Sequence, residues 1–409
     1  MGRRLRGVAY HHAVSNAIPS SRRRGRRRRS GRAPLVAIVG TRGYPSFYGG
    51  FETAVRRLAP ALADRGWRVR VYCRPGEDAR GSVADPRVER VLTRGVSSRA
   101  LSTLSFGLTS VVHALFHKPD VALVMNVANG FWLPLLRLRG ITTVVNVDGI
   151  EWERDKWSPL GKAVFRWGAR FTARFADELI FDAEAIGDYW RREFHRDGVF
   201  VPYGGEWLED TSSHDELSPA SFVLLVARFV PENSVGVFLE SAERVVDELD
   251  LDVVLVGSAP AGDPLQERAR TLASENPRIH HLGHVSDDAK LFGLWKDAAV
   301  YFHGHTVGGT NPALVQAMAL GSRTVARDTV YNREVLGDAA HYCDSTPDSV
   351  VAALASSLAD PRPLEQMAQA RAAQRYAWDL VVDGYDQALR GRLEPTAKTL
   401  LSAGASEKG

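Results

Sequence analysis

Short apolar runs rich in valine, isoleucine and leucine alternate along this chain with segments of helical periodicity. Five runs fall in the first half and four in the second: LVAIVG, RVRVYC, VALVMN, TTVVNV and ELIFDA, then SFVLLVA, LDVVLVG, RIHHLGH and AVYFHGH. A strand buried on both faces is apolar throughout, and parallel strands need crossover connections that are usually helices. The sequence therefore predicts an α/β fold with parallel sheets covered by helices.

A polar stretch separates the two series of runs. Residues 204–220 are rich in turn-forming residues and lack periodicity, which is typical of a linker. We therefore expect two Rossmann-like domains that face each other across a cleft. The predicted parts are a basic disordered extension (1–33), the N-terminal domain on the acceptor side (34–203), the linker (204–220) and the C-terminal domain that binds the ligand (221–375). A C-terminal helix (376–391), for which crossing back to the N-terminal domain is one option, and a disordered tail (392–409) follow.

Charge is distributed unevenly along the chain. The formal net charge is +4, but residues 1–33 hold 11 arginines and no acid, which leaves 41 basic against 48 acidic residues in the rest. The run from Arg22 to Arg29 is compatible with an arm for nucleic acid or a membrane surface. A solvated tail or an over-extended start fits it better, because no aromatic or motif context accompanies it. We expect no specific nucleic-acid binding.

The cellular setting is indicated by three features. No apolar stretch reaches the ~20 residues of a spanning helix, and none follows the arginines as a secretory signal requires. Cys73 and Cys343 are the only cysteines and lack metal-ligand spacing. These features predict a cytoplasmic protein without a metal site.

The loop GTRGYPSFYGGFET, Gly40 to Thr53, follows the first apolar run and precedes a helical pattern. A glycine-rich turn of this kind directs backbone N–H groups and a helix N-terminus at a ligand, which favours phosphate. The loop contains neither G-x-G-x-x-G nor a Walker sequence, and the second run ends on Cys73 and Arg74 instead of an acid. A nicotinamide site and a P-loop are therefore not indicated.

Four stretches in this order resemble one enzyme family: GTRGYPSFYGGFETAVRRLAPALADRGWRVRVYC, NVDGIEWERDKWS, ARFVPENS and HGHTVGGTNPALVQAMALG. They are similar to the family 4 retaining glycosyltransferases of the GT-B fold. Within it they resemble the bacterial rhamnosyltransferase-like branch that builds capsular and exopolysaccharide repeat units. The resemblance covers about residues 34–391 and implies transfer of a sugar from a dTDP-, UDP- or GDP-sugar to a glycan or polyprenyl-linked acceptor, without a metal or other cofactor.

The resemblance also implies roles for individual residues. Arg228 follows the run FVLLVA, where a guanidinium would reach the cleft and grip phosphate oxygens, although a surface salt bridge is the alternative. Asn233 stands where the wider family has a second cationic clamp, and Gln316 stands where it has a glutamate that binds the ribose. The glycines of the first loop, Gly49 and Gly50, would close over the diphosphate. Backbone N–H groups of a second turn would contact the sugar and the diphosphate; this turn consists of Gly308, Gly309, Thr310 and Asn311.

Two further side chains are candidates near the donor sugar. Asp148, at a predicted strand end, is assigned sugar binding or electrostatic support near the anomeric carbon, with capping of the following turn as the alternative. His305 is assigned contact with sugar or phosphate, with a solvated loop histidine as the alternative.

The predicted helix LGKAVFRWGARFTARFADE carries Lys162, Arg166, Arg170 and Arg174 at four-residue intervals beside Trp167, Phe171 and Phe175. Such a helix suits peripheral attachment to the anionic inner face of a plasma membrane. A core-packed aromatic face with a solvated basic edge explains the spacing equally well.

Three functions remain open on the sequence alone: a glycosyltransferase, a GT-B sugar-nucleotide epimerase, and a nucleotide-sugar-binding protein without catalysis. An epimerase needs carboxylates placed to move a proton at the sugar, and no such pair is evident at the predicted strand ends. Asn233 and Gln316 are what would favour binding without turnover.

Overall fold

The computed structural model describes residues 32–46, 49–76, 83–96, 102–154, 157–207, 211–212, 214 and 217–393. The arginine run at 22–29, the tail beyond 393 and part of the predicted linker lie outside the described residues, as does Tyr48 of the glycine-rich loop.

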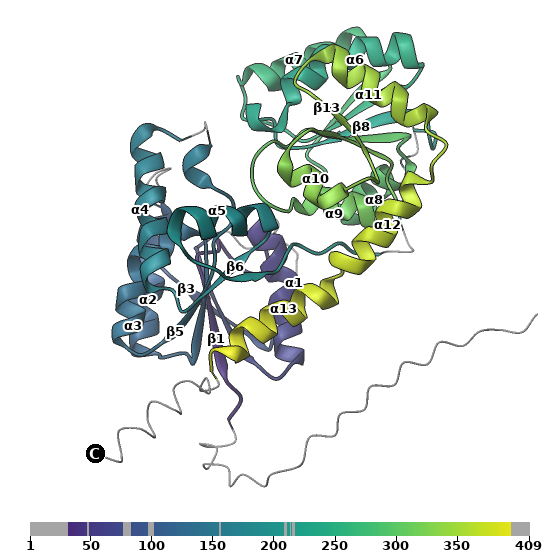
Figure 1. The fold of residues 1–409 in the computed structure, drawn as a ribbon. Coiled ribbons are helices and arrows are strands. Elements are labelled where there is room, and N and C mark those ends of the chain that lie inside the picture. Colours follow the sequence, from purple (N-terminus) through teal and green to yellow (C-terminus); the bar gives the residue numbers. More distant parts are fainter. Residues whose placement is uncertain are drawn as a thin grey trace, which may run out of the picture. The chain divides into compact units, whose positions relative to one another are not determined.

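The N-terminal domain is built on a seven-stranded parallel sheet (Figure 1). Its strand order is β3-β2-β1-β4-β5-β6-β7. The strands are β1 (Leu35–Val39), β2 (Arg68–Cys73), β3 (Val88–Leu92), β4 (Val121–Met125), β5 (Thr142–Asn146), β6 (Glu178–Phe181) and β7 (Val199–Phe200). The central strands are buried because helices cover both faces of the sheet.

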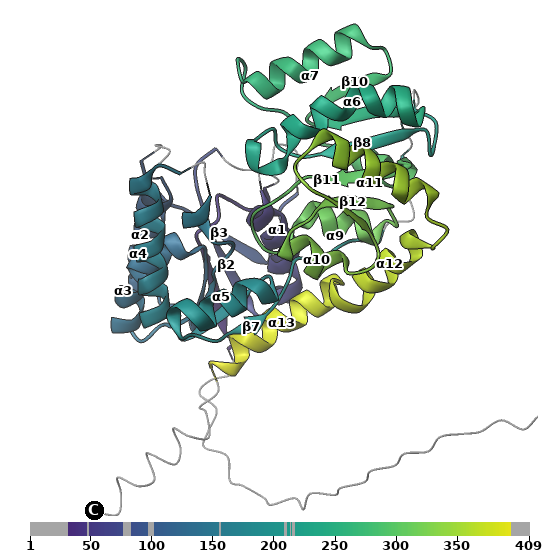
Figure 2. The same ribbon diagram turned by 45° about the horizontal axis from the view of Figure 1, so that its top comes forward.

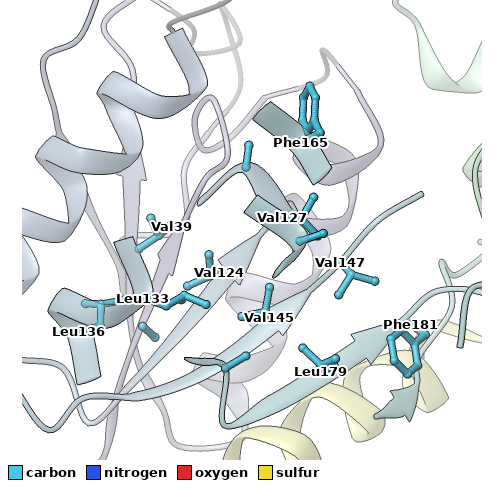
Figure 3. Close-up of a cluster of buried hydrophobic side chains, with 14 of the residues drawn as sticks. Val39, Val124, Val127, Leu133, Leu136, Val145, Val147, Phe165, Leu179 and Phe181 are labelled. Carbon is cyan, nitrogen blue, oxygen red and sulfur yellow. The ribbon is translucent and has the colours of Figure 1, made fainter. Parts of the chain in front are cut away.

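Different helices cover the two faces of this sheet. One face packs on α1 (Gly50–Asp64) and on the last helix, α13 (Trp378–Gly391). The other packs on α2 (Ser102–Phe116), the 3₁₀ turn η1 (Val127–Trp132), α3 (Leu133–Leu138), α4 (Pro159–Phe175) and α5 (Glu184–Phe194). Figure 3 shows part of this second core, which contains valines of the strands and of η1, Leu133 and Leu136 of α3 and Phe165 of α4.

The C-terminal domain contains a six-stranded parallel sheet with the order β10-β9-β8-β11-β12-β13. Its strands are β8 (Phe222–Val226), β9 (Asp252–Val256), β10 (Ile279–Gly283), β11 (Val300–His303), β12 (Thr324–Arg327) and β13 (His341–Cys343). One face packs on α6 (Val235–Leu249), α7 (Pro264–Glu275) and α11 (Pro347–Ala359). The other packs on α8 (Asp288–Asp297), α9 (Pro312–Ala319), α10 (Val330–Leu336) and α12 (Leu364–Arg375).

The strand order reverses once in each sheet, between β1 and β4 and between β8 and β11. Ligands of doubly wound sheets bind outside the carboxyl ends of the strands at such a switch point. The predicted fold class, two Rossmann-like domains with parallel sheets, is confirmed. Strands β3, β7, β12 and β13 were not among the predicted runs.

The last helix belongs to the core of the first domain, although the second domain precedes it in the chain. Val381, Val382 and Leu389 of α13 are buried against the N-terminal sheet. The hydroxyl of Tyr385 accepts a hydrogen bond from the side-chain amide of Asn146, at the end of β5, over 2.7 Å. Figure 2 shows α13 running past β7.

Across the part of the chain that the structure describes, no helix combines the length and the apolar character needed to cross a bilayer.

Candidate functional site

A cleft of about 660 Å³ lies where loops from the carboxyl ends of the two sheets meet. All predicted site residues except Gln316 line it: Gly49, Gly50, Asp148, Arg228, Asn233, His305, Gly308, Gly309, Thr310 and Asn311. The site is therefore assembled from residues far apart in the sequence.

Arg228 stands two residues beyond the end of β8 and is exposed in the cleft. Its guanidinium has no ion-pair partner among the described residues. Most other exposed arginines of the C-terminal domain do have one, for example Arg333, which lies 2.5 Å from Asp328. Arg228 is thus a positive charge at the sheet's switch point that no acidic side chain neutralises, as a site for phosphate requires.

Asn233 is buried beside Arg228, but it acts on the backbone. Its side-chain amide donates a hydrogen bond to the carbonyl oxygen of Arg228 over 2.8 Å. The residue ends the short 3₁₀ turn η3 (Pro231–Asn233), which leads into α6. Asn233 also lines the cleft, and the hydrogen bond from its amide fixes the backbone of the Arg228 loop.

His305 lies at the end of a row of polar aromatic side chains that begins in the core. The hydroxyl of Tyr301 and Nδ1 of His303 are 2.9 Å apart, and the rings of His303 and His305 stack at 4.6 Å. Burial, together with the charges of Arg228 and Arg154, lowers the pKa of His305 to about 3. The imidazole is neutral at physiological pH and offers a hydrogen bond, not a charge.

The second glycine turn ends in a capped helix. Asn311 is the N-cap of α9, and its side-chain oxygen accepts a hydrogen bond from the backbone N–H of Ala313 over 3.0 Å. The helix begins at Pro312, a residue that suits the first helical position because it has no N–H to leave unpaired. Gly308 has a φ of +96°, which favours glycine. The first turn of α9 therefore presents backbone N–H groups and the positive end of the helix dipole to the cleft.

A glutamate of the following helix accepts hydrogen bonds from the start of the first glycine loop. One carboxylate oxygen of Glu52, in the first turn of α1, accepts hydrogen bonds from the backbone N–H of Arg42 at 2.9 Å and from the hydroxyl of Thr41 at 3.3 Å. Gly49 is the N-cap of α1 and supplies no side-chain cap. The start of the loop, at Thr41 and Arg42, is thus held by the helix that follows the loop, and Gly49 and Gly50 add no side chains to the cleft wall.

Asp148 occupies a strained turn beyond β5. Its φ is +60°, and that of Asn126, beyond the neighbouring strand β4, is +71°. The amide of Asn126 lies 3.4 Å from a carboxylate oxygen of Asp148. Non-glycine residues hold such backbone angles only when their surroundings enforce them, and these positions are concentrated at functional sites.

Asp182 was not among the predicted site residues, although it follows β6 directly and lines the cleft. One of its carboxyl oxygens, Oδ1, is buried without a hydrogen-bond partner. Its backbone carbonyl accepts a hydrogen bond from the hydroxyl of Thr310. Burial, and secondarily the charges of Asp148 and Glu334, raise the pKa of Asp182 well above its usual range, against the opposing effect of Arg154.

Asp148 and Asp182 correct one expectation from the sequence. No carboxylate pair was evident at the predicted strand ends, yet these two acids follow β5 and β6, which are neighbours in the sheet. The sequence did contain a signal for Asp182, because this acid comes directly after the apolar run ELIF, just as Arg228 comes directly after FVLLVA. The cleft also contains Arg74, Glu151, Arg154, Tyr203 and Glu232, which the sequence analysis did not assign to the site.

Gln316 does not line the cleft, contrary to the expectation that it meets the ribose. Its side-chain oxygen accepts a hydrogen bond from the backbone N–H of Glu206 at 3.0 Å, and its amide donates to the carbonyl of the same residue at 2.8 Å. The Glu206 carboxylate pairs with Arg57 of α1. Gln316 therefore attaches the segment between the domains to α9.

We expect Gln316→Glu to lower the free energy of unfolding by about 1–2 kcal/mol, because a carboxylate cannot donate to the Glu206 carbonyl and would face it unpaired. Denaturant unfolding checks this, with Gln316→Met as the variant that removes both hydrogen bonds. Dissociation constants for dTDP, UDP and GDP should change by equal factors. A selective gain for UDP and GDP would instead show that position 316 senses the ribose.

Among the described residues, no group of three or more histidine, cysteine or acidic side chains is placed to hold a metal ion.

Comparisons with known proteins agree with this geometry. Residues 49–204 match the model of the glycosyl transferase 4-like domain, and residues 220–360 match that of glycosyl transferases group 1. No curated protein matches the sequence significantly.

Solved structures share the fold at low identity. Sucrose-phosphate synthase from Thermosynechococcus elongatus is 17% identical with a TM-score of 0.71, and the match covers 90% of this chain and 100% of that one. HepE from Anabaena, in complex with UDP and glucose, is 16% identical with a TM-score of 0.68, covering 88% and 99%. Starch synthase IV from Arabidopsis thaliana, bound to ADP and acarbose, is 12% identical with a TM-score of 0.66, covering 89% and 100%.

Proposed function

We propose that this glycosyltransferase of the GT-B type, which joins a 4-like domain to a group 1 domain, moves a sugar from a nucleoside diphosphate sugar to a glycan or polyprenyl-linked acceptor with retention of configuration. The observation that carries the proposal is the unneutralised guanidinium of Arg228 at the switch point of the second sheet, beside the N-terminus of α9. The solved complexes of HepE with UDP and of starch synthase IV with ADP support a nucleoside diphosphate as the leaving group.

The reaction breaks the anomeric C–O bond and leaves negative charge on the β-phosphate. Arg228 would bind the phosphate oxygens through two N–H groups, and the N–H groups at the start of α9 would add fixed dipoles. His305, being neutral, would donate a hydrogen bond without requiring a counter-charge. Because these groups are in place before the bond breaks, they stabilise the transition state more than the intact donor.

The acids of the N-terminal domain would face the donor sugar. A carboxylate at Asp148 would favour the positive charge that develops at the anomeric carbon, and a protonated Asp182 would hydrogen-bond to a sugar hydroxyl. No charge–charge repulsion between the two arises while Asp182 holds its proton. Positive charge at the carbon and negative charge at the phosphate are thus met from opposite walls of the cleft.

The finer assignment is a deoxyhexose donor such as dTDP-rhamnose, used in the synthesis of a capsular or exopolysaccharide repeat unit. It rests on the resemblance of GTRGYPSFYGGFET, NVDGIEW and GGTNP to the rhamnosyltransferase-like branch. A polyprenyl-linked acceptor would place the enzyme in the cytoplasm, at the inner face of the plasma membrane. No metal or other cofactor is part of this proposal.

A thermal-shift screen over dTDP-, UDP- and GDP-sugars tests the donor, followed by incubation of the preferred donor, radiolabelled in the sugar, with lipid extracts. The expected result is a rise in Tm with one class of nucleotide sugar and transfer of label to lipid-linked material. Binding without release of nucleoside diphosphate under any acceptor condition would favour a non-catalytic binding protein.

The paired acids Asp148 and Asp182 favour epimerisation as a second candidate, since such a reaction needs groups that remove and return a proton. Incubating the donor in D₂O distinguishes the two reactions. An epimerase exchanges a carbon-bound hydrogen of the sugar for deuterium, whereas a transferase leaves every C–H bond intact. The match to two glycosyltransferase domain models favours the latter.

The raised pKa of Asp182 predicts how stability depends on pH. Its folded pKa lies above the unfolded value of about 3.9, so the folded state loses stability as pH rises from that value through the raised pKa. Asp182→Asn cannot ionise and should remove this loss, raising Tm at pH 8 by about 2 °C and flattening the dependence of Tm on pH. Asp188→Asn, at an exposed acid on α5, is the control. An equal effect of both variants would contradict a buried protonated Asp182.

A further inference from the structure

The helices α2, α3 and α4 and the turn η1 cover one face of the N-terminal sheet and contain no aspartate or glutamate. We refer to these four elements as the acid-free layer. Beyond residue 33 the chain has 48 acidic and 41 basic residues, so this layer is an exception in an acidic protein. Both Figure 1 and Figure 2 show α2, α3 and α4 together on the side of the sheet away from α13.

The arginines of the acid-free layer lack acidic partners. Arg137 on α3 and Arg166, Arg170 and Arg174 on α4 are exposed, and none forms an ion pair with a described residue. Elsewhere in this domain, exposed Arg191 contacts Asp188 at 2.6 Å and Asp197 at 2.9 Å. Lys162, the fourth basic residue of the predicted stripe, is only partly exposed and has a partner of its own. The four arginines therefore present positive charge that the fold does not neutralise.

Large apolar side chains are exposed on the same layer. Trp167 is 54% exposed, Leu160 76%, Leu138 86% and Phe116 79%. The guanidinium of Arg170 stacks on the Trp167 ring at 4.7 Å. Only Trp167 of the three predicted stripe aromatics is exposed, because Phe171 packs on Phe131 at 5.2 Å and on Phe175 at 5.8 Å. Arginines interspersed with protruding apolar groups are the composition of a helix surface that lies in a lipid interface.

We propose that the acid-free layer docks the protein on an anionic lipid bilayer. Each arginine near such a surface gains electrostatic attraction, while Trp167 and the leucines enter the headgroup region. The rest of the folded chain is acidic and is repelled, so the layer determines which side of the protein faces the membrane. The inference deepens the proposed function and rests on it for the lipid-linked acceptor.

The layer also adjoins the cleft. Phe165 of α4 and Trp157, shortly before that helix, line the cleft, while Arg166 and Trp167 of the same helix face outward. Docking through α4 would thus hold the N-terminal wall of the cleft near the bilayer surface, where the sugar of a lipid-linked acceptor lies. A soluble oligosaccharide acceptor would give this arrangement no purpose.

The test measures sedimentation of the full chain with vesicles of 30% phosphatidylglycerol in phosphatidylcholine and with pure phosphatidylcholine vesicles. Glutamine at all four layer arginines should weaken binding to the anionic vesicles by about 10-fold or more, since each charge contributes separately. The control replaces four exposed arginines on other helices, which also removes four charges: Arg192, Arg268, Arg270 and Arg333. It should weaken binding by less than about 3-fold, and an equal loss in both variants would overturn the proposal.

A second readout separates the layer from the arginine run at 22–29, which also attracts anionic lipid. Lipids brominated on the acyl chain should quench a component of the tryptophan fluorescence that is missing in Trp167→Ala. Vesicle binding without quenching of Trp167 would mean that the protein docks through another surface, such as the N-terminal arginines, and the proposal would fail. The dissociation constants for UDP, GDP and dTDP in solution, which the layer variants should leave unchanged, report separately on the nucleotide site of the proposed function.

Discussion

Arg228→Ala is expected to lower kcat by about 100-fold or more, because it removes charge stabilisation that is needed mainly while the phosphate leaves. The guanidinium is exposed in the cleft without an acidic partner among the described residues, whereas that of Arg154, which also lines the cleft, lies 2.8 Å from a carboxylate oxygen of Glu151. Donor KM should change less than kcat, since the intact diphosphate already carries its charge and is also bound by the N-terminus of α9. Steady-state kinetics with the donor identified by the screen measures both constants.

Two matched variants make the Arg228 result interpretable. Arg228→Lys retains the charge but loses the bidentate geometry, and it should recover only part of the rate. Arg270→Ala, at an exposed arginine on α7, should leave kcat within about 2-fold because surface ion pairs contribute little. Near-normal turnover in Arg228→Ala would remove this residue from the catalytic site and leave the N-terminus of α9 as the remaining phosphate site.

Gly257→Ala is expected to destabilise the C-terminal domain by about 3 kcal/mol or more. Gly257 follows β9 with a φ of +135°, and a Cβ there would lie 1.7 Å from the carbonyl oxygen of Ala227. That contact is with backbone, so side-chain rotation cannot relieve it. The strand end that carries Arg228 would have to move, and nucleotide affinity should fall along with stability.

Gly262→Ala is the control that separates crowding from backbone conformation. Gly262 also has a positive φ, +83°, but a Cβ there would meet no atom within 4 Å. It should cost only the conformational part, about 1–2 kcal/mol. Urea unfolding of both variants measures the difference. Equal losses would show that the close approach of Gly257 to Ala227 relaxes without cost.

The fold was predictable where strands are buried on both faces. β1, β4 and β8 read as unbroken apolar runs because helices cover them on each side. β3 was missed because it is an edge strand whose apolar run is interrupted by two adjacent charged residues, Glu89 and Arg90. β7 and β13 span two and three residues, which is too short for any pattern to emerge.

The site was predictable where a residue stands at the end of a recognisable strand, as Arg228 and Asp148 do. Gln316 differs because its partner, Glu206, lies 110 positions away in the segment between the domains. No spacing within α9 reveals that contact. Asn233 differs because its hydrogen bond to Arg228 is local but depends on the turn that η3 makes. In both cases tertiary structure gives the side-chain amide a backbone partner that the sequence pattern does not reveal.

The position of α13 has a consequence for how the protein is made. Residues of the first domain leave the ribosome long before α13 is synthesised, yet Val381, Val382 and Leu389 complete the core on one face of its sheet. Until then that face is exposed to water and to other nascent chains, and a chaperone that binds apolar surface has a target there. The N-terminal domain is thus completed only after the whole C-terminal domain has been synthesised, and a premature stop that removes α13 would damage the domain synthesised first.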